Sequence, residues 1–176
     1  MAAKIETKQV KAMATSSEWN RLSSDEQEKI LAHQSEAPVK ISALAREIGV
    51  PINGATLAPG ISGEIRPSNG SFLIRINRHD PPRRQRFTAA HELAHFLLHR
   101  DQIGSGISDD VLYRSSLSDR REAEANRLAA DILMPDDLVQ EWLANARTLK
   151  VEDVVGYLAD RFDVSEAAMK IRLGLA

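Results

Sequence analysis

The feature that most constrains this chain is the segment HELAH at residues 91–95, within an apolar stretch near the middle of the 176 residues. In an α-helix, residues four apart differ by about 40° in direction and about 6 Å along the axis. The imidazoles of His91 and His95 therefore lie side by side and can hold one ion. Glu92 lies beside that ion without pointing straight at it, where a general base for an attacking water is needed.

The expected helix around this segment is apolar almost all round, which predicts that it is buried. Its apolar residues are Phe87, Ala89, Ala90, Leu93, Ala94, Phe96, Leu97 and Leu98. Burying two imidazoles and a carboxylate without partners costs free energy, and a metal ion is one compensation. The alternative is a buried helix whose histidines bond to backbone or other side chains. His99 lies about 12 Å from His91 along the axis, so we expect a supporting role rather than ligation.

Catalytic zinc normally takes three protein ligands, so the pair needs a third. The chain has no cysteine, which leaves histidine, aspartate or glutamate. In the predicted helix 121–134, Glu122 and Asn126 fall on the apolar stripe, whereas Glu124 lies about 200° away from Glu122, on the expected solvent face. Glu122 is the candidate ligand, and a buried salt bridge to an arginine is the alternative. Asn126 could hydrogen-bond a ligand histidine and fix its ring.

The composition is that of a soluble globular protein, with 43% hydrophobic and 27% charged residues. The formal net charge of −2 gives no general electrostatic case for binding nucleic acid or a membrane. No apolar run approaches membrane-spanning length, and the N-terminus has no apolar leader. We therefore expect a cytoplasmic protein that does not associate with membranes.

The pattern of elements predicts an α+β fold, in which a small antiparallel sheet packs against several helices. Ser23 and Glu26 form a capping-box pattern that predicts a helix over 23–34, and a second helix is expected over 38–50. Residues 60–77 predict a β-hairpin with its turn at 67–70, and a further strand is expected near 52–58. From Pro82 onward the pattern is helical.

Three segments are expected along the chain. Residues 1–35 would be an N-terminal arm and helix, with residues 1 to about 16 polar and frayed. Residues 36–145 would hold the metal site, and residues 146–176 a helical hairpin packed on or appended to the core.

The C-terminal hairpin also resembles a helix-turn-helix, whose second helix carries Lys170 and Arg172. Two basic residues are few for a phosphate-binding face. Packing on the core is therefore the favoured interpretation, and DNA binding the less favoured one. The competing function is a DNA- or repressor-binding regulatory protein with a structural metal site.

The segments RFTAAHELAHFLLH and EAEANRLAADILMP, at residues 86–99 and 122–135, resemble the ImmA/IrrE family of metallopeptidases. The resemblance covers roughly residues 38–138, and residues 162–174 are also similar. One departure is Leu128, which stands where the family often has an aromatic residue.

This resemblance implies a zincin-like fold in which His91, His95 and Glu122 hold one zinc ion and Glu92 is the catalytic base. Manganese or iron would also suit this ligand set. The resemblance further implies a zinc-dependent endopeptidase that cleaves a helix-turn-helix transcriptional repressor, in a prophage, mobile-element, stress-response or toxin–antitoxin setting. Tyr113, Arg114 and His99 are candidates to line the cleft and stabilise the oxyanion.

Overall fold

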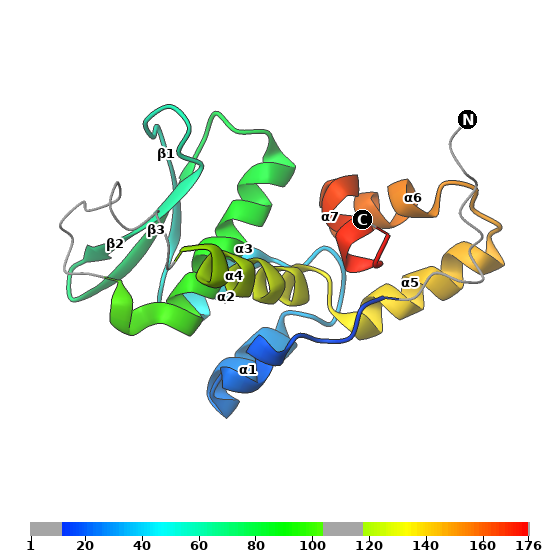
Figure 1. Cartoon of the computed structure of the whole chain (residues 1–176), viewed down its shortest axis with the longest axis horizontal. Helices are drawn as coiled ribbons and strands as arrows, with labels where there is room; N and C mark the ends of the chain where they lie inside the picture. The colour runs from blue at the N-terminus through cyan, green and yellow to red at the C-terminus, as the bar shows by residue number, and fades with distance from the viewer. Residues whose placement is uncertain (1–11, 104–117, 176) are drawn as a thin grey trace.

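The computed structural model describes residues 12–103 and 118–175 (Figure 1). In chain order, its elements are η1 (Ser17–Arg21), α1 (Ser24–Ala32), α2 (Ile41–Ile48), β1 (Ile52–Ala55), β2 (Gly63–Ser68), β3 (Ser71–Asn77), α3 (Pro82–His99), η2 (Arg100–Gln102), α4 (Ser118–Leu133), α5 (Asp136–Thr148), α6 (Val154–Phe162) and α7 (Glu166–Arg172). Across these two ranges, each helix is too short or too polar to cross a membrane.

The ends of the helices follow the local sequence. At the start of α1, the Ser23 side chain accepts a hydrogen bond from the Glu26 backbone, and the Glu26 carboxylate accepts one from the Ser23 backbone. This confirms the predicted capping box. Gly49 ends α2 at φ 95°, in the left-handed region that glycine adopts without strain. Pro82 occupies the first turn of α3, where its missing N–H is not needed.

The sheet has three strands in the order β1-β3-β2. The predicted hairpin is confirmed, because β2 and β3 pair antiparallel around a turn in which Asn69 and Gly70 both have positive φ. The further strand near residues 52–58 is also present as β1, but it pairs parallel to β3. The sheet is therefore mixed and not wholly antiparallel as predicted, because the chain passes from the edge strand β1 to the opposite edge strand β2 before it reaches the central strand β3.

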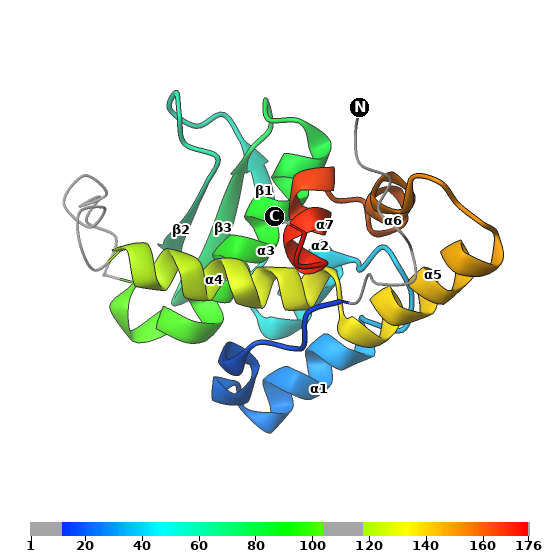
Figure 2. The same cartoon turned by 45° about the vertical axis from the view of Figure 1, so that its right-hand side comes forward.

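Helix α3 is the central element of the fold, with strands β2 and β3 against one side and α4 against another (Figure 2). The small residues Ala89, Ala90 and Ala94 are buried on α3 and allow close packing. Larger side chains complete the core around them, including Leu44, Ile74, Leu93, Leu128, Ile132 and Leu133. This arrangement of seven helices beside one small sheet in the described ranges confirms the α+β fold class.

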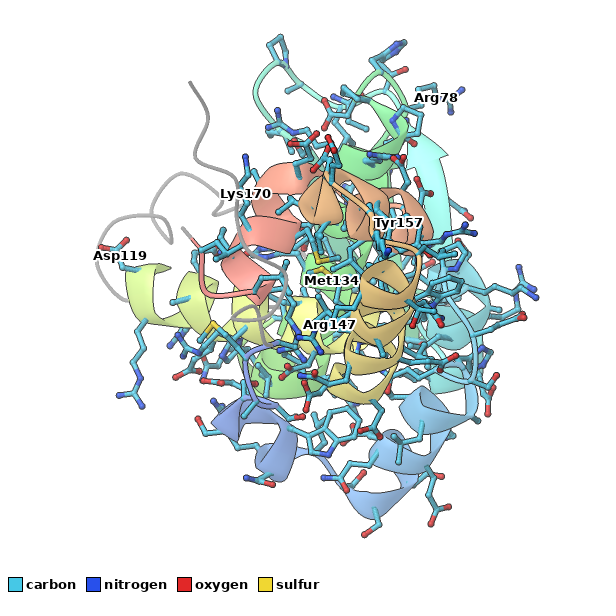
Figure 3. All side chains as sticks on the ribbon, turned by 90° about the vertical axis from the view of Figure 1, so that its right-hand side faces the viewer. Arg78, Asp119, Met134, Arg147, Tyr157 and Lys170 are labelled. Atoms are coloured by element: carbon cyan, nitrogen blue, oxygen red, sulfur yellow. The ribbon has the colours of Figure 1, made fainter. Side chains whose placement is uncertain are left out.

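The C-terminal helices α5, α6 and α7 lie at the other end of the molecule from the sheet (Figure 1). The segment expected to begin at residue 146 begins inside α5, and the two helices of the predicted hairpin are α6 and α7. Lys170 points outward from α7, whereas Met134 lies in the interior (Figure 3). Arg172 is only 5% exposed and forms an ion pair with Asp131. It is therefore not available on the surface of α7 as a phosphate-binding residue.

The expectation of a frayed arm is wrong for residues 12–16. Ala12 is buried, and the Met13 backbone N–H donates to the Arg172 carbonyl oxygen. Ser16 donates hydrogen bonds to Asp131 from both its backbone and its hydroxyl group. Residues 12–16 pack on the core because the buried carboxylate of Asp131, on α4, supplies an acceptor that their sequence does not reveal.

Candidate metal centre

Helix α3 places His91 and His95 on one face, as their spacing predicts. Their Nε2 atoms lie 3.0 Å apart, and the two rings meet edge to face with centroids 4.6 Å apart. Two Nε2 atoms that converge in this way can share one positive ion. Without a shared proton or ion, the lone pairs of these two nitrogens would face each other at this distance and repel.

Helix α4 brings Glu122 to the same point. One carboxylate oxygen lies 3.1 Å from His91 Nε2 and the other lies 3.2 Å from His95 Nε2. One atom from each of the three residues can be chosen so that all lie within 4.8 Å of one another, and the group could hold a metal ion. The side chain of Glu122 is 52% exposed. Helical phase therefore predicted its direction, toward α3, but not its depth, because it lies at the open edge of the contact between the helices.

The opposite nitrogens of the two imidazoles have partners that fit ligation. His91 Nδ1 lies 2.9 Å from Asn126 Oδ1, and His95 Nδ1 lies 3.1 Å from His99 Nδ1. A neutral histidine that offers its Nε2 lone pair to a metal carries its proton on Nδ1, where it can donate such a bond. The structure thus brings Asn126 and His99 to the positions from which they can fix the two rings.

The protonation of His95 also suits a metal ligand. Burial lowers the pKa of His95 to about 3, and the charges of neighbouring His91 and His99 act in the same direction. The imidazole is therefore neutral near pH 7, with a lone pair available.

Glu92 lies beside this group and faces strand β2. A Cβ atom built on Gly63 would lie 3.1 Å from both Cγ and Oε1 of Glu92. The absence of a side chain at Gly63 lets the backbone of β2 approach the carboxylate of Glu92 this closely. Glu92 is thus half-buried between α3 and the outer strand β2, one residue after the candidate ligand His91.

Glu124 is a residue whose placement the sequence did not predict. We expected it on a solvated helix face, but it is 6% exposed. Its carboxylate contacts Arg21, His99 and Arg120, at 2.7, 3.1 and 2.9 Å. The hydrogen bond from Arg21, followed by that from His99, lowers the pKa of Glu124 to about 2.

The prediction failed because α4 is covered on two sides. Its phase was assigned from the apolar stripe that faces α3, whereas η1 covers a second face that carries Glu124, Arg127 and Asp131. Arg21 belongs to η1 and was missed altogether, since nothing in its local sequence relates it to a residue 103 positions away. The remaining candidates, Tyr113 and Arg114, lie outside the described residues.

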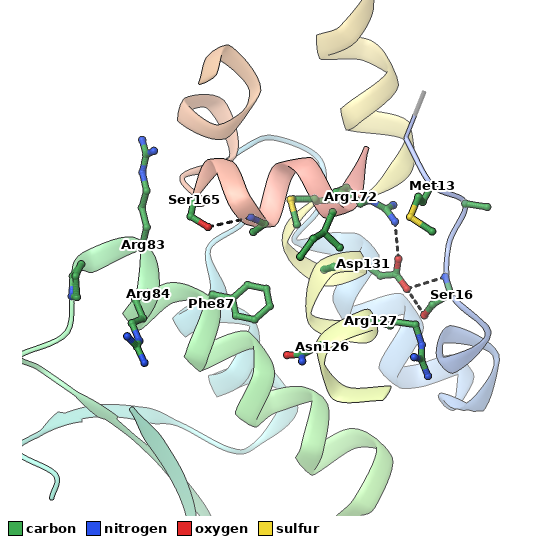
Figure 4. A pocket seen from close by; sticks show the side chains of 16 residues that line it. Met13, Ser16, Arg83, Arg84, Phe87, Asn126, Arg127, Asp131, Ser165 and Arg172 are labelled. Carbon is green, nitrogen blue, oxygen red and sulfur yellow. Dashed lines mark hydrogen bonds and ion pairs between the residues drawn. The ribbon is translucent and has the colours of Figure 1, made fainter. Parts of the chain in front are cut away.

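A groove of about 760 Å³ lies next to the candidate metal centre (Figure 4). Its walls come from the N-terminal arm, the first turns of α3, one face of α4, and α7. Apolar side chains such as Phe87, Ala130 and Ile171 line it. Asn126 belongs both to this wall and to the metal centre, through its hydrogen bond with His91.

Two histidines one turn apart on a helix, with a glutamate between them in sequence and another from a second helix, form an arrangement typical of HExxH metallopeptidases. A family model described as the IrrE N-terminal-like domain, of the M78 peptidase type, matches residues 45–174. The chain belongs to this family, which confirms the ImmA/IrrE resemblance.

A solved structure with a similar fold is a Mycobacterium tuberculosis transcriptional regulator. It is 19% identical, with a TM-score of 0.54 over 85% of this chain and 47% of the regulator. At this identity the likeness shows the fold alone, and our chain spans about half the length of that protein. Comparison with curated proteins gave no match.

Proposed function

We propose that this protein is a zinc-dependent endopeptidase whose substrate is a helix-turn-helix transcriptional repressor. The observation that carries the proposal is the convergence of His91, His95 and Glu122, with Glu92 beside them but directed toward β2. Membership of a metallopeptidase family supports the reaction class. The repressor as substrate rests on the family resemblance, and it would place the reaction in the cytoplasm.

The donor set favours zinc. Two imidazole nitrogens and one carboxylate are a ligand set of catalytic zinc, which keeps a fourth position open. The exposed edge at Glu122 leaves such a position accessible from outside. Metal analysis of the purified protein would distinguish zinc from manganese or iron, which the same donors can bind.

When bound, zinc would supply a Lewis acid that makes water more acidic and polarises the peptide carbonyl. The residues of the chain perform the other steps. Glu92 takes a proton from the attacking water and passes it to the nitrogen of the leaving amine. Asn126 and His99 hold the two imidazoles in the orientation that exposes Nε2. Because β2 is one of the two outer strands of the described sheet and Gly63 lies against Glu92, an extended peptide alongside β2 would pass the base.

The test is to mix the purified protein with candidate helix-turn-helix repressors, with and without a chelator, and to follow cleavage. Glu92→Gln should keep its metal but cleave about 10²- to 10⁴-fold more slowly, the usual contribution of a positioned acid–base group. Glu28→Gln, which removes an exposed carboxylate on α1, is the matched control and should cleave at the wild-type rate.

Two results would contradict this proposal. Cleavage by Glu92→Gln at the wild-type rate would remove Glu92 as the base. Purified protein without metal, whose stability does not change on chelation, would remove the metal centre, because a bound metal stabilises the folded state. If no repressor is cleaved and a salt-dependent DNA shift is found instead, the regulatory alternative would hold.

A further inference from the structure

A continuous chain of polar contacts runs from the candidate metal ligand His95 to the N-terminal helix η1. His95 Nδ1 lies 3.1 Å from His99 Nδ1, and His99 Nε2 lies 3.1 Å from Glu124 Oε2. The same carboxylate oxygen accepts a hydrogen bond of 2.7 Å from Arg21 Nη1. The side chains of His99 and Glu124 are both buried, so the contact between them is shielded from water.

The geometry allows one arrangement of protons along this chain when His95 binds a metal through Nε2. His95 then carries its proton on Nδ1 and donates it toward His99. His99 must accept at Nδ1, and so carries its own proton on Nε2 and donates that one to Glu124. A doubly protonated His99 would set two N–H groups against each other, because its Nδ1 would also be a donor.

The far end of the chain lies outside the segment that defines the family. Arg21 belongs to η1, whereas the family model begins at residue 45. Glu124 has a further partner in Arg120, one turn earlier on α4. The carboxylate is therefore held from two sides, and its position is fixed relative to His99.

We propose that Arg21, Glu124 and His99 form a positioning relay that fixes the ring and the tautomer of His95 and so strengthens metal binding. The proposal rests on the metal centre of the proposed function, and it adds η1 as a part of that centre. His99 and Glu124 are positioning residues, since neither reaches the converging Nε2 atoms. Outer partners of ligand histidines typically contribute a factor of 10 to 100 in metal affinity.

The competing explanation is that Glu124 merely ties η1 to α4. The chain offers a matched control, because Glu18 on η1 forms a second ion pair with Arg127 on α4, at 2.6 Å. Glu18, like Glu124, is a buried carboxylate, but within the described residues its hydrogen bonds, to Ser17 and Arg127, do not lead to a histidine. Glu124→Gln and Glu18→Gln therefore weaken the same junction, and only Glu124→Gln replaces the charged acceptor of His99 with a weaker, neutral one.

The experiment measures Zn²⁺ affinity by competition with a chromophoric chelator, together with the unfolding of the metal-free proteins in urea. Glu124→Gln should bind Zn²⁺ about 10- to 100-fold more weakly than wild type, and Glu18→Gln as tightly as wild type, although both lose stability. His99→Phe should weaken binding to the same extent as Glu124→Gln while it leaves the ion pair of Arg21 with Glu124 in place. If the buried variants do not fold, Arg21→Gln, at a side chain that is 46% exposed, should give a smaller loss in the same direction.

A second measurement reads the relay directly. In the zinc-loaded wild type, ¹⁵N NMR of the imidazoles should show His95 protonated on Nδ1 and His99 protonated on Nε2. The visible spectrum of the Co²⁺-loaded protein should change in Glu124→Gln and not in Glu18→Gln, because only the first alters the orientation of a ligand.

The outcomes separate the two proposals. Wild-type protein that binds no metal would overturn the metal centre, and the relay with it. Wild-type protein that binds Zn²⁺, with unchanged affinity in Glu124→Gln and His99→Phe, would overturn the relay alone. The opposite tautomer at His99 would also overturn the relay.

Discussion

The buried ion pair between Asp131 and Arg172 allows a stability prediction in which the two partners are not equivalent. Asp131 accepts hydrogen bonds from the Ser16 backbone and hydroxyl and, at 3.1 Å, from Arg172. Arg172 has one other acceptor, the carbonyl oxygen of Met134, and its Nη2 atom has no hydrogen-bond partner within the described residues. Asp131 therefore has other donors if Arg172 is removed, whereas Arg172 forms an ion pair with no second carboxylate in the part of the chain that the structure describes.

The predicted costs follow from this difference. Asp131→Ala leaves a buried, unpaired guanidinium, for which a loss of about 3–5 kcal/mol is typical. In a chain of this length, that corresponds to a fall in Tm of roughly 6–20 °C. Arg172→Met leaves Asp131 with the two Ser16 donors, and burial already raises the pKa of Asp131, so that it can take up a proton. We expect a loss of about 1–3 kcal/mol, the range for one buried polar contact.

The assay is urea unfolding of wild type, both single variants and the double variant Asp131→Ala/Arg172→Met. The double variant should be more stable than Asp131→Ala alone, since it no longer buries an unpaired cation. Its deviation from additivity should reach about 0.5–3 kcal/mol. Equal losses in the two single variants, or strictly additive losses in the double variant, would refute the reasoning.

Two further predictions concern the surroundings of the metal centre. Gly63→Ala places a Cβ 2.5 Å from the Thr88 methyl group and 3.1 Å from Glu92. It should cost about 1–3 kcal/mol in urea unfolding and lower kcat, whereas Gly54→Ala, whose nearest contact is 3.9 Å, is the control and should leave kcat unchanged. Because the pKa of Glu124 is lowered from 4.5 to about 2, its contribution to stability is present above pH 4.5 and is lost as the pH falls toward 2. The unfolding free energy of Glu124→Gln should therefore fall less than that of wild type between pH 4.5 and 2. An equal fall in the two proteins would contradict the lowered pKa of Glu124.

Sequence reasoning was most successful where a short-range pattern determines geometry. The spacing of His91 and His95 predicted that both imidazoles lie on one helix face. The helical phase of Glu122 predicted that its side chain points toward α3. The turn around Gly70 and the capping box at Ser23 could also be predicted from the sequence, because each depends on contacts within a few residues.

It failed where a helix is covered by a distant segment. The phase of α4 has one apolar stripe, but Glu124 and Asp131 are buried on a second face by partners more than 100 positions earlier in the chain, Arg21 and Ser16. Such a face carries charged residues whose partners are also charged or polar, so it has no hydrophobic signature. Arg172 was assigned to the surface for the same reason. It is charged, but it is buried in the structure.

Because η1 and residues 12–16 pack on α4, the segment that matches the family model is shorter than the part of the chain that packs together. A protein trimmed to the matched segment would begin at residue 45 and would lack Ser16, Glu18 and Arg21. It would expose the charged face of α4, leaving Arg127 and Glu124 without partners that hold them in the full chain. Grafting only the matched segment into another protein would therefore separate α4 from residues that cover it, and a transferred segment should also include residues 12–44.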